Sequence, residues 1–183
     1  MAVFDITACA ALREDITPIV ARAAAVIRQC GPSALRQKPD GSPVTAADEA
    51  AEAVILRGLE RLAPNIPIIS EERAAPSAGS TGEVYFLVDP LDGTREFIAG
   101  RDEFAVNIAL INRGTPLMGI IAAPAADLVW RGIVGGGGAE RMVLSDQSRR
   151  TAIRTRPRPA HPVIMISRSH LDAGTEAYLA RVP

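Results

Sequence analysis

Two aspartates, Asp89 and Asp92, lie three positions apart in the sequence VDPLDGTREF at residues 88–97. They follow a β-like run, and Pro90 between them fixes one backbone φ angle and removes one backbone donor. The turn can therefore present two carboxylates and the Leu91 carbonyl together, which is a set of oxygen ligands only. Because crowded carboxylates repel one another unless a cation neutralises them, this set predicts a hard divalent ion, with Mg²⁺ as the natural occupant.

The neighbouring residues add a phosphate site to this predicted metal site. The motif SEE at residues 70–72 also follows a β-like run, so a fold that lays the two strands side by side would add a third carboxylate. Gly93 and Thr94 supply backbone N–H groups at a possible helix start, where anions bind. Two divalent ions about 3.5–4 Å apart stabilise the attacking and leaving oxygens of a displacement at phosphorus. These residues predict a phosphatase site in which Thr94 orients the attacking water.

A plain turn is the alternative interpretation of the same motif. Asp, Pro and Gly are the commonest turn-forming residues, and they often cluster without a functional role. The types and spacing of these residues therefore leave both the turn and the metal site open.

The first part of the chain predicts an amphipathic helix. Apolar residues between Leu12 and Ile27 recur every three or four positions, and this stripe stops at Gly31 and Pro32. Pro18 lies inside the stripe, so it is expected to kink or split the helix.

A second helix is predicted to begin after Thr45 and to end before Pro64. Thr45 is a good N-terminal cap, and Asp48 lies in the first turn. A short strand at residues 35–38 and a turn at residues 41–43 are expected to precede this helix.

The middle of the chain changes to short β-like runs. They cover residues 66–69, 84–88, 104–111, 117–122 and 128–134, and residues 74–83 are expected to form a surface loop. The alternation of Phe104, Val106, Ile108 and Leu110 predicts one buried strand face. Helices followed by consecutive strands predict an α+β fold that layers helices against a sheet.

A break in the chain is predicted at residues 149–159, which are basic and contain prolines. It divides the chain into an N-terminal lobe at residues 1–148, which carries the metal and phosphate sites, and a second part at residues 149–183. The second part contains a linker, a predicted strand at residues 163–167 and a predicted helix at residues 171–181.

Composition and charge restrict the class of protein. With 48% apolar and 22% charged residues, the 183-residue chain has an ordinary globular composition. Its net charge of −1 gives no general attraction for nucleic acid or anionic lipid, so an anionic substrate must be held by a local site. The sequence lacks the run of about 18 apolar residues that a membrane span needs, and we expect a cytoplasmic protein without a transmembrane segment.

Four motifs together resemble the inositol monophosphatase superfamily of Mg²⁺-dependent, Li⁺-inhibited phosphatases. They are GSPVTAAD at residues 41–48, ISEE at residues 69–72, DPLDGTREF at residues 89–97 and EFAVNIALI at residues 103–111. Within the superfamily, TREF resembles the 3′(2′),5′-bisphosphate nucleotidase branch, because inositol monophosphatases usually show Thr-Asn-Phe there. SRSH at residues 167–170 is similar to the same branch.

The resemblance implies a role for each residue of the site. Two or three Mg²⁺ ions would be bound by Glu71, Asp89, Asp92 and the carbonyl of Leu91, with Asp89 shared between two ions. The catalytic residues would be Asp48, Thr94 and Glu71, with Asp48 and Thr94 activating the attacking water. The scissile phosphate would lie at Leu91, Asp92, Gly93 and Thr94. From its position alone, Asp48 is a first-turn acid that the helix dipole favours.

The resemblance also implies a fold, a substrate and a partner. The fold would be a layered α/β sandwich of the inositol monophosphatase and fructose-1,6-bisphosphatase type. The substrate would be adenosine 3′,5′-bisphosphate, a by-product of sulfate assimilation, which is hydrolysed at its 3′-phosphate to AMP and phosphate. The chain would form a homodimer. An inositol or sugar monophosphatase that uses the same site is the alternative function.

The C-terminal part departs from the family's pattern. Members of the family continue further, to a Trp-Asp motif whose aspartate completes the second metal site, whereas this sequence ends in YLARVP and its only tryptophan, Trp130, precedes Arg131. We therefore expect the N-terminal lobe to be present and the C-terminal lobe to be largely missing. A catalytically inactive, truncated remnant is a further alternative. A sheet that lacks its later strands exposes an edge and an apolar face, which favours dimerisation or instability.

Other residues with possible chemistry are given structural interpretations. The four glycines at residues 135–138 lack the Lys-Ser/Thr of a phosphate-binding loop and predict a hairpin loop. The arginines at residues 149–158 predict a solvated linker. His161 and His170 lack the spacing and partners of a zinc site. For Arg95, contact with a second phosphate of the nucleotide and a solvated helix position both remain open.

Overall fold

A computed structural model describes residues 5–31, 36–37, 43–73, 82–161, 163–167 and 171–182. The chain separates into two compact units, at residues 1–153 and 154–183, and each is described by itself. The lobe boundary that the sequence suggests, between residues 148 and 149, stays a prediction.

The first helix, α1 (Ile6–Cys30), is capped by Asp5, whose Oδ1 accepts a hydrogen bond of 2.8 Å from the N–H of Ala8. Its buried stripe includes Ile16, Val20 and Ile27, as the sequence predicts. The predicted split at Pro18 is wrong, because α1 continues through this residue. A proline removes one backbone hydrogen bond, and the many remaining bonds and the buried stripe of this long helix keep it continuous.

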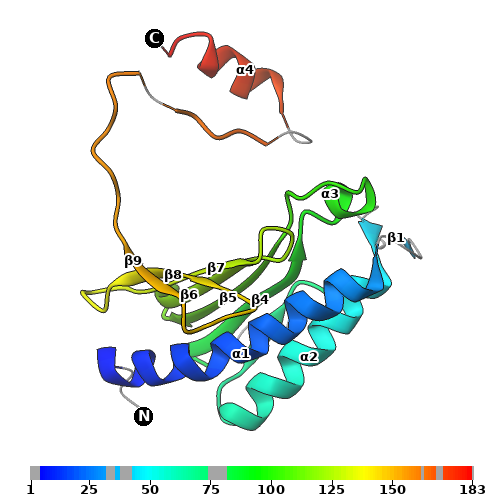
Figure 1. Cartoon of the computed structure of the whole chain (residues 1–183), viewed down its shortest axis with the longest axis vertical. Helices are drawn as coiled ribbons and strands as arrows, with labels where there is room; N and C mark the ends of the chain where they lie inside the picture. Colours follow the sequence, from blue (N-terminus) through cyan, green and yellow to red (C-terminus); the bar gives the residue numbers. More distant parts are fainter. Residues whose placement is uncertain are drawn as a thin grey trace. The chain divides into compact units, whose positions relative to one another are not determined.

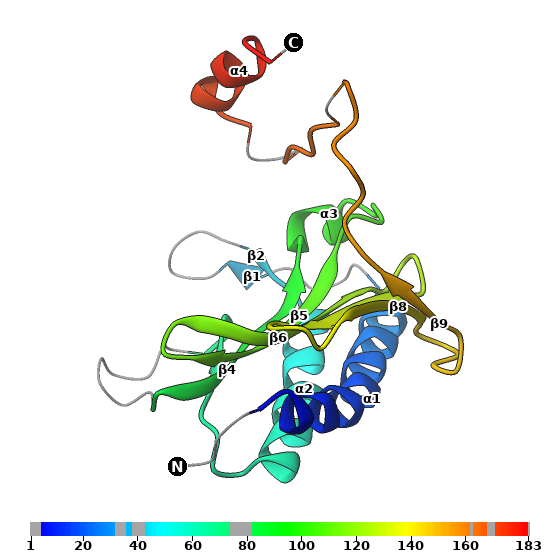
Figure 2. The ribbon, with the colours of Figure 1, turned by 90° about the vertical axis from the view of Figure 1, so that its left-hand side faces the viewer.

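The second helix, α2 (Ala46–Leu62), begins with the predicted cap at Thr45. It lies beside α1, and both helices cover the same face of the sheet (Figures 1 and 2). The two helices approach closely at Gly58, where an added Cβ would lie 2.7 Å from the Cδ1 of Ile19. None of the described helices combines the length and apolar character needed to cross a bilayer.

The sheet of the first unit has seven strands in the order in which they follow along the chain. They are β3 (Ile68–Ser70), β4 (Val84–Asp92), β5 (Ala105–Asn112), β6 (Thr115–Ala123), β7 (Leu128–Ile133), β8 (Ala139–Val143) and β9 (Arg150–Ile153). Only the β3–β4 pair is parallel, and each later pair is antiparallel. Two short strands, β1 (Arg36–Gln37) and β2 (Pro43–Val44), form a separate ladder, and a five-residue helix, α3 (Thr94–Ile98), follows β4.

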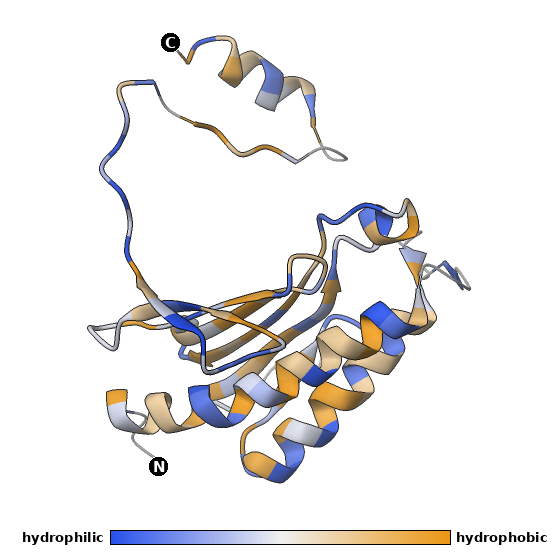
Figure 3. Cartoon of the chain, in the orientation of Figure 1, coloured by the Kyte–Doolittle hydropathy of each residue, from blue (hydrophilic) through white to orange (hydrophobic). Residues whose placement is uncertain are grey.

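The core lies between the two long helices and one face of the sheet. Alternate strand residues are buried on this face: Phe86, Val88, Val106, Ile108, Leu110, Met118, Ile120 and Val129. The buried alternation predicted along β5 is confirmed, and Figure 3 shows apolar residues along the strands. On the opposite face, Leu87 and Ile121 are 46% and 50% exposed. The sheet therefore has one packed face and one open face in the described residues.

Several boundaries differ from the sequence-based expectations. Strand β9 lies in the segment predicted as a break; its four residues are all exposed, so it lacks the apolar alternation that would have revealed it. The sequence predicts a strand at residues 163–167, but these residues form none, since no described strand pairs with them. The predicted C-terminal helix is confirmed as α4 (Ala173–Leu179).

Three expectations fall wholly or partly on residues that lie outside the described ranges. Of the strand predicted at residues 35–38, Arg36 and Gln37 form β1 and the rest is outside. The same holds for most of the turn at residues 41–43 and the loop at residues 74–83. The mixed α/β architecture, with helices layered on a sheet, is the predicted fold class.

Candidate active site

The parallel pairing of β3 with β4 brings the two acidic motifs together. Ser70 is in register with Val88, and the N–H of Glu71 donates to the Val88 carbonyl at 3.1 Å. Glu71 and Asp89 therefore follow the paired residues at the same edge of the sheet. This is the side-by-side arrangement on which the predicted third carboxylate depends.

A β-bulge places the two aspartates of β4. Asp89 pairs with Asn107 and Asp92 pairs with Ala105, so three steps along β4 match two steps along β5. The buried Leu91 lies in this bulge, and its N–H donates to Asp89 Oδ1 at 3.2 Å. A bulge re-aims side chains at a strand end; here Asp89 is half-buried and Asp92 is exposed.

The electrostatics of this edge disfavour the ionised form of Asp89. Burial, followed by the negative charges of Glu71 and Asp92 and a hydrogen bond with Glu71, raises the pKa of Asp89 to about 7, although the Leu91 N–H lowers it. A positive charge nearby would lower this pKa and favour the ionised carboxylate. The edge is thus a place where a cation would be bound favourably.

The donor set fits a hard divalent ion in its chemistry, since carboxylate and carbonyl oxygens are the ligands that Mg²⁺ prefers. Within the described ranges, no three acidic, histidine or cysteine side chains already surround one point closely enough to hold a metal. Glu71 and Asp92 are exposed, so their side chains can rotate toward a bound ion. The Leu91 carbonyl oxygen lies 3.0 Å from the Thr94 hydroxyl, which is also 3.0 Å from Asp48 Oδ1. The hydroxyl has one proton for these two acceptors, so the Leu91 carbonyl keeps a lone pair that can face a cation.

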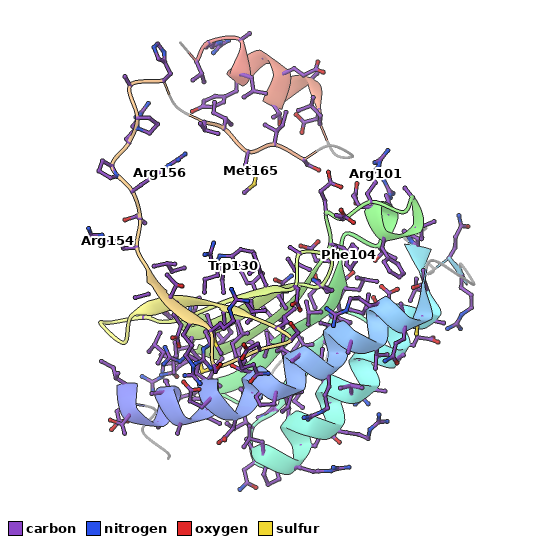
Figure 4. The ribbon with its side chains drawn as sticks, in the orientation of Figure 1. Arg101, Phe104, Trp130, Arg154, Arg156 and Met165 are labelled. Carbon is purple, nitrogen blue, oxygen red and sulfur yellow. The ribbon has the colours of Figure 1, made fainter. Side chains whose placement is uncertain are left out.

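Gly93 shapes the turn between β4 and α3. Its φ of 88° is in the left-handed region, and an added Cβ would lie 2.6 Å from the Glu103 carbonyl oxygen. Only glycine fits there without strain. The rings of Phe97 and Phe104 meet edge to face with centroids 5.1 Å apart, and Figure 4 shows Phe104 next to α3. This packing fixes the short helix against the start of β5.

Asp48 reaches the same turn from α2, although 46 residues separate it from Thr94. Its Oδ2 accepts hydrogen bonds from the Thr45 N–H at 2.8 Å and from the Thr45 hydroxyl at 2.6 Å. Its Oδ1 accepts the Thr94 hydroxyl at 3.0 Å. One oxygen therefore caps the helix while the other contacts the candidate site, so both interpretations of Asp48 describe a real contact. The pairing implied by the family resemblance is present, and its catalytic role stays a prediction.

Because Asp48 is buried, its carboxylate contacts the solvent-facing part of the site through the Thr94 hydroxyl. Asp48 is 0% exposed, whereas Thr94 is half-buried. A water molecule at the edge of the sheet cannot touch the Asp48 carboxylate directly, and it can reach this carboxylate through the Thr94 hydroxyl.

The remaining candidate residues of the sequence differ in their surroundings. Arg95 is exposed on α3, His161 is exposed in the second unit, and His170 lies outside the described residues. The glycines at residues 135–138 form the predicted hairpin loop between β7 and β8. Arg150 belongs to β9 and bonds Glu14, while the later arginines of the predicted linker are exposed.

A cavity of about 760 Å³ opens on the unpacked face of the sheet beside Glu71 and Asp89. Its lining includes Asn107, which lies within the motif EFAVNIALI but has no role assigned from the sequence. The available sign was a lone amide at an outward position of β5, between Ala105 and Ala109.

The chain belongs to the inositol monophosphatase family, since residues 1–171 match this family. It is 44% identical over 147 residues to the 3′(2′),5′-bisphosphate nucleotidase CysQ of Shigella flexneri, covering 79% of this chain and 57% of that protein. Among solved structures, CysQ from Bacteroides thetaiotaomicron is 28% identical with a TM-score of 0.75, covering 93% of this chain and 67% of the other. An inositol monophosphatase from Anabaena is 32% identical with a TM-score of 0.61, over 73% and 47% of the two chains. The chain thus spans a little over half the length of its curated relatives.

Proposed function

We propose that this chain carries the metal- and phosphate-binding part of a phosphomonoesterase that converts adenosine 3′,5′-bisphosphate to AMP and phosphate. The observation that carries the proposal is the crowding of Glu71, Asp89 and Asp92 directly beside the hydrogen-bonded pair of Asp48 and Thr94. The choice of a bisphosphorylated nucleoside is supported by the similarity to proteins named 3′(2′),5′-bisphosphate nucleotidase. A cytoplasmic location and a homodimer stay predictions.

Glu71, Asp89 and Asp92, with the Leu91 carbonyl, would hold two or three Mg²⁺ ions. When bound, these ions would neutralise the carboxylates, increase the acidity of the attacking water and stabilise the leaving oxygen. The exposed Glu71 and Asp92 would close onto the ions, while the half-buried Asp89 would remain in place in the β4 bulge.

Thr94 and Asp48 would move the proton of the attacking water. The Thr94 hydroxyl donates to Asp48 Oδ1, so its oxygen can accept a proton from water while its own proton passes to Asp48. Thr45 holds the other Asp48 oxygen with two hydrogen bonds, which fixes the carboxylate for this task. General base catalysis of this kind contributes about 10²–10⁴-fold in rate.

The turn at Gly93 and Thr94 would hold the scissile phosphate through backbone N–H groups. The close approach of Gly93 to the Glu103 carbonyl keeps this turn tight. The phosphate would then lie between the carboxylate edge and the Thr94 hydroxyl, which is the geometry that an attack on phosphorus by a water held at Thr94 needs.

An inositol or sugar monophosphatase is a second candidate function, favoured by the similarity to the inositol monophosphatase from Anabaena. The carboxylate edge and the Asp48–Thr94 pair would serve this reaction equally, since they act on the phosphate and not on the alcohol. A chain that binds metal without turnover is a third possibility, which the phosphate-release assay distinguishes from the other two.

A parallel phosphate-release assay separates these functions. The chain is offered adenosine 3′,5′-bisphosphate and inositol 1-phosphate with and without Mg²⁺ and Li⁺. We expect Mg²⁺-dependent, Li⁺-sensitive release mainly from the nucleotide, lost in Asp92→Asn and retained in Asp15→Asn, a control at an exposed acid of α1. Preferential release from inositol 1-phosphate would favour the second function. An active Asp92→Asn variant would contradict the proposed site, and metal binding without release would favour the third possibility.

A further inference from the structure

The cavity beside the carboxylate edge has an unusual distribution of polar groups. Strands β5 and β6 contribute six residues to its lining: Asn107, Ile108, Ala109, Gly119, Ile120 and Ile121. Asn107 is the one member of this set whose side chain can form hydrogen bonds. The polar side chain therefore lies at a single position of an otherwise apolar floor.

That position is directly opposite Asp89. The two residues are cross-strand partners of β4 and β5, so their side chains lie on the same face of the sheet with Cβ atoms about 4.5–5.5 Å apart. Both line the same cavity, and both are half-buried. An amide and a carboxylate at this separation are within reach of a hydrogen bond after small side-chain rotations.

The side-chain amide of Asn107 has no hydrogen-bond partner among the residues that the structure describes. Asp89 Oδ1 accepts the Leu91 N–H, and a side-chain hydrogen bond joins Asp89 to Glu71. Metal binding by both carboxylates would replace the contact with Glu71, so Asp89 would then need another partner to fix its direction. A half-buried amide that lacks a partner, placed beside a carboxylate that needs orienting, indicates a contact that forms when the site is occupied.

We propose that Asn107 is a positioning residue for Asp89, an inference that rests on the proposed function. With divalent ions bound, the Asn107 Nδ2–H would donate to the Asp89 carboxylate and would hold this ligand in one orientation. Asparagine suits this task because it donates without a charge. A lysine would repel the ions, and an aspartate would add a competing ligand. Partners that orient a metal ligand typically change metal affinity by about 10–100-fold when they are removed.

Binding of Mn²⁺ to this chain, measured by calorimetry, tests the inference, because Mn²⁺ takes the same oxygen ligands as Mg²⁺. We expect Asn107→Ala to weaken Mn²⁺ binding about 10-fold. The matched control is Asn112→Ala, which removes the same side chain at the far end of the same strand and should leave the affinity unchanged. The metal-free melting temperature of Asn107→Ala should equal that of the unaltered chain, since the amide has no partner to lose.

The outcomes separate this inference from the proposed function. Weaker binding with an unchanged metal-free melting temperature supports the positioning role. An unchanged affinity in Asn107→Ala, with binding lost in Asp92→Asn, overturns the inference alone. A parallel loss of affinity and metal-free stability in Asn107→Ala also overturns it, because the side chain would then be structural. Absence of Mn²⁺ binding by the unaltered chain overturns both the inference and the proposed metal site.

Discussion

Two groups of acidic side chains lie against or beside the same sheet, and the charges around them are opposite in sign. The first group, the inner cluster, consists of Glu14 and Glu140 around Arg131, on the face that packs against α1. The Arg131 side chain is 0% exposed, and it lies 2.7 Å from Glu14 Oε1 and 2.8 Å from Glu140 Oε1. Burial would raise the pKa of Glu14, but the hydrogen bond and charge of Arg131, with two further arginines, outweigh it and lower that pKa.

The second group, the edge cluster, consists of Glu71, Asp89 and Asp92. Burial and the two negative neighbours raise the pKa of Asp89 to about 7, so the charges that act on it there have the same sign as its own. Where acids hold the fold together, the chain supplies an arginine. At the edge, the charges that raise the pKa of Asp89 are both negative, and a cation from solution would compensate them, as expected for a binding site and not for a structural ion pair.

The largest effect is expected where the edge cluster meets Asp48. Thr94→Val keeps the size of the side chain but removes the hydroxyl that connects the buried Asp48 to the edge. We expect a loss of about 10³-fold in Mg²⁺-dependent phosphate release, within the range for a lost proton-transfer group. Stability should fall by about 1–2 kcal/mol, because Asp48 loses one hydrogen-bond donor. Thr94→Ser should retain most of the activity. Equal activity in Thr94→Val and the unaltered chain would show that the hydroxyl takes no part in proton transfer.

The next effect tests the inner cluster. Arg131→Met replaces the guanidinium by an apolar chain of similar length and leaves Glu14 and Glu140 without their main partner. We expect the free energy of unfolding to fall by about 3 kcal/mol, measured by urea denaturation. Arg141→Met is the control, since this exposed arginine of β8 should contribute less than about 0.5 kcal/mol. A small effect in Arg131→Met would mean that the other arginines suffice and that the two clusters differ less than their geometry indicates.

The edge cluster should gain stability from an added cation, in contrast to the inner cluster, whose charges Arg131 already compensates. Because the pKa of Asp89 is raised from 3.8 to about 7, its contribution to metal-free stability is fully present below pH 3.8 and is lost as the pH rises through about 7. Metal binding needs the ionised carboxylate, so stabilisation by Mg²⁺ should be small at low pH and should increase through the same window.

Melting curves at several pH values measure this dependence. At a Mg²⁺ concentration of 100 times Kd, the expected gain is about 2.7 kcal/mol above pH 7. Asp89→Asn should remove most of the gain and make the metal-free stability less dependent on pH. A gain from Mg²⁺ that is equal at pH 5 and pH 8 would contradict the coupling of metal binding to Asp89.

The contrast between the clusters also explains which features could be predicted from the sequence. The edge cluster is local, since Asp89, Asp92 and Gly93 belong to one turn and Glu71 follows a strand that pairs with it. Such a motif is visible in the order of the residues. The inner cluster joins α1 to β7 and β8, and the contact of Arg131 with Glu14 spans 117 positions. The one local sign was an arginine at an inward position of β7, between Val129 and Ile133.

The misjudged elements depend on partners that are distant or absent. Strand β9 exists because β8 offers its edge, although its own four residues are exposed. Residues 163–167 have the composition of a strand, but no described strand pairs with them. Helix α1 continues through Pro18 because its buried face packs along the sheet. In each case, tertiary packing outweighs local propensity.

The smallest expected effect separates distance from burial as the cause of the inner cluster's contribution. Arg113 donates to both carboxylate oxygens of Glu83, at 2.8 and 2.9 Å, so this pair is as close as those of Arg131. Its side chains are 66% and 47% exposed, and water screens the attraction. We therefore expect Glu83→Gln to change the free energy of unfolding by less than about 0.5 kcal/mol. If Glu83→Gln and Arg131→Met had equal effects, burial would not be what makes the inner cluster structural, and the like-charge surroundings of Asp89 would no longer set the edge cluster apart from a structural ion pair.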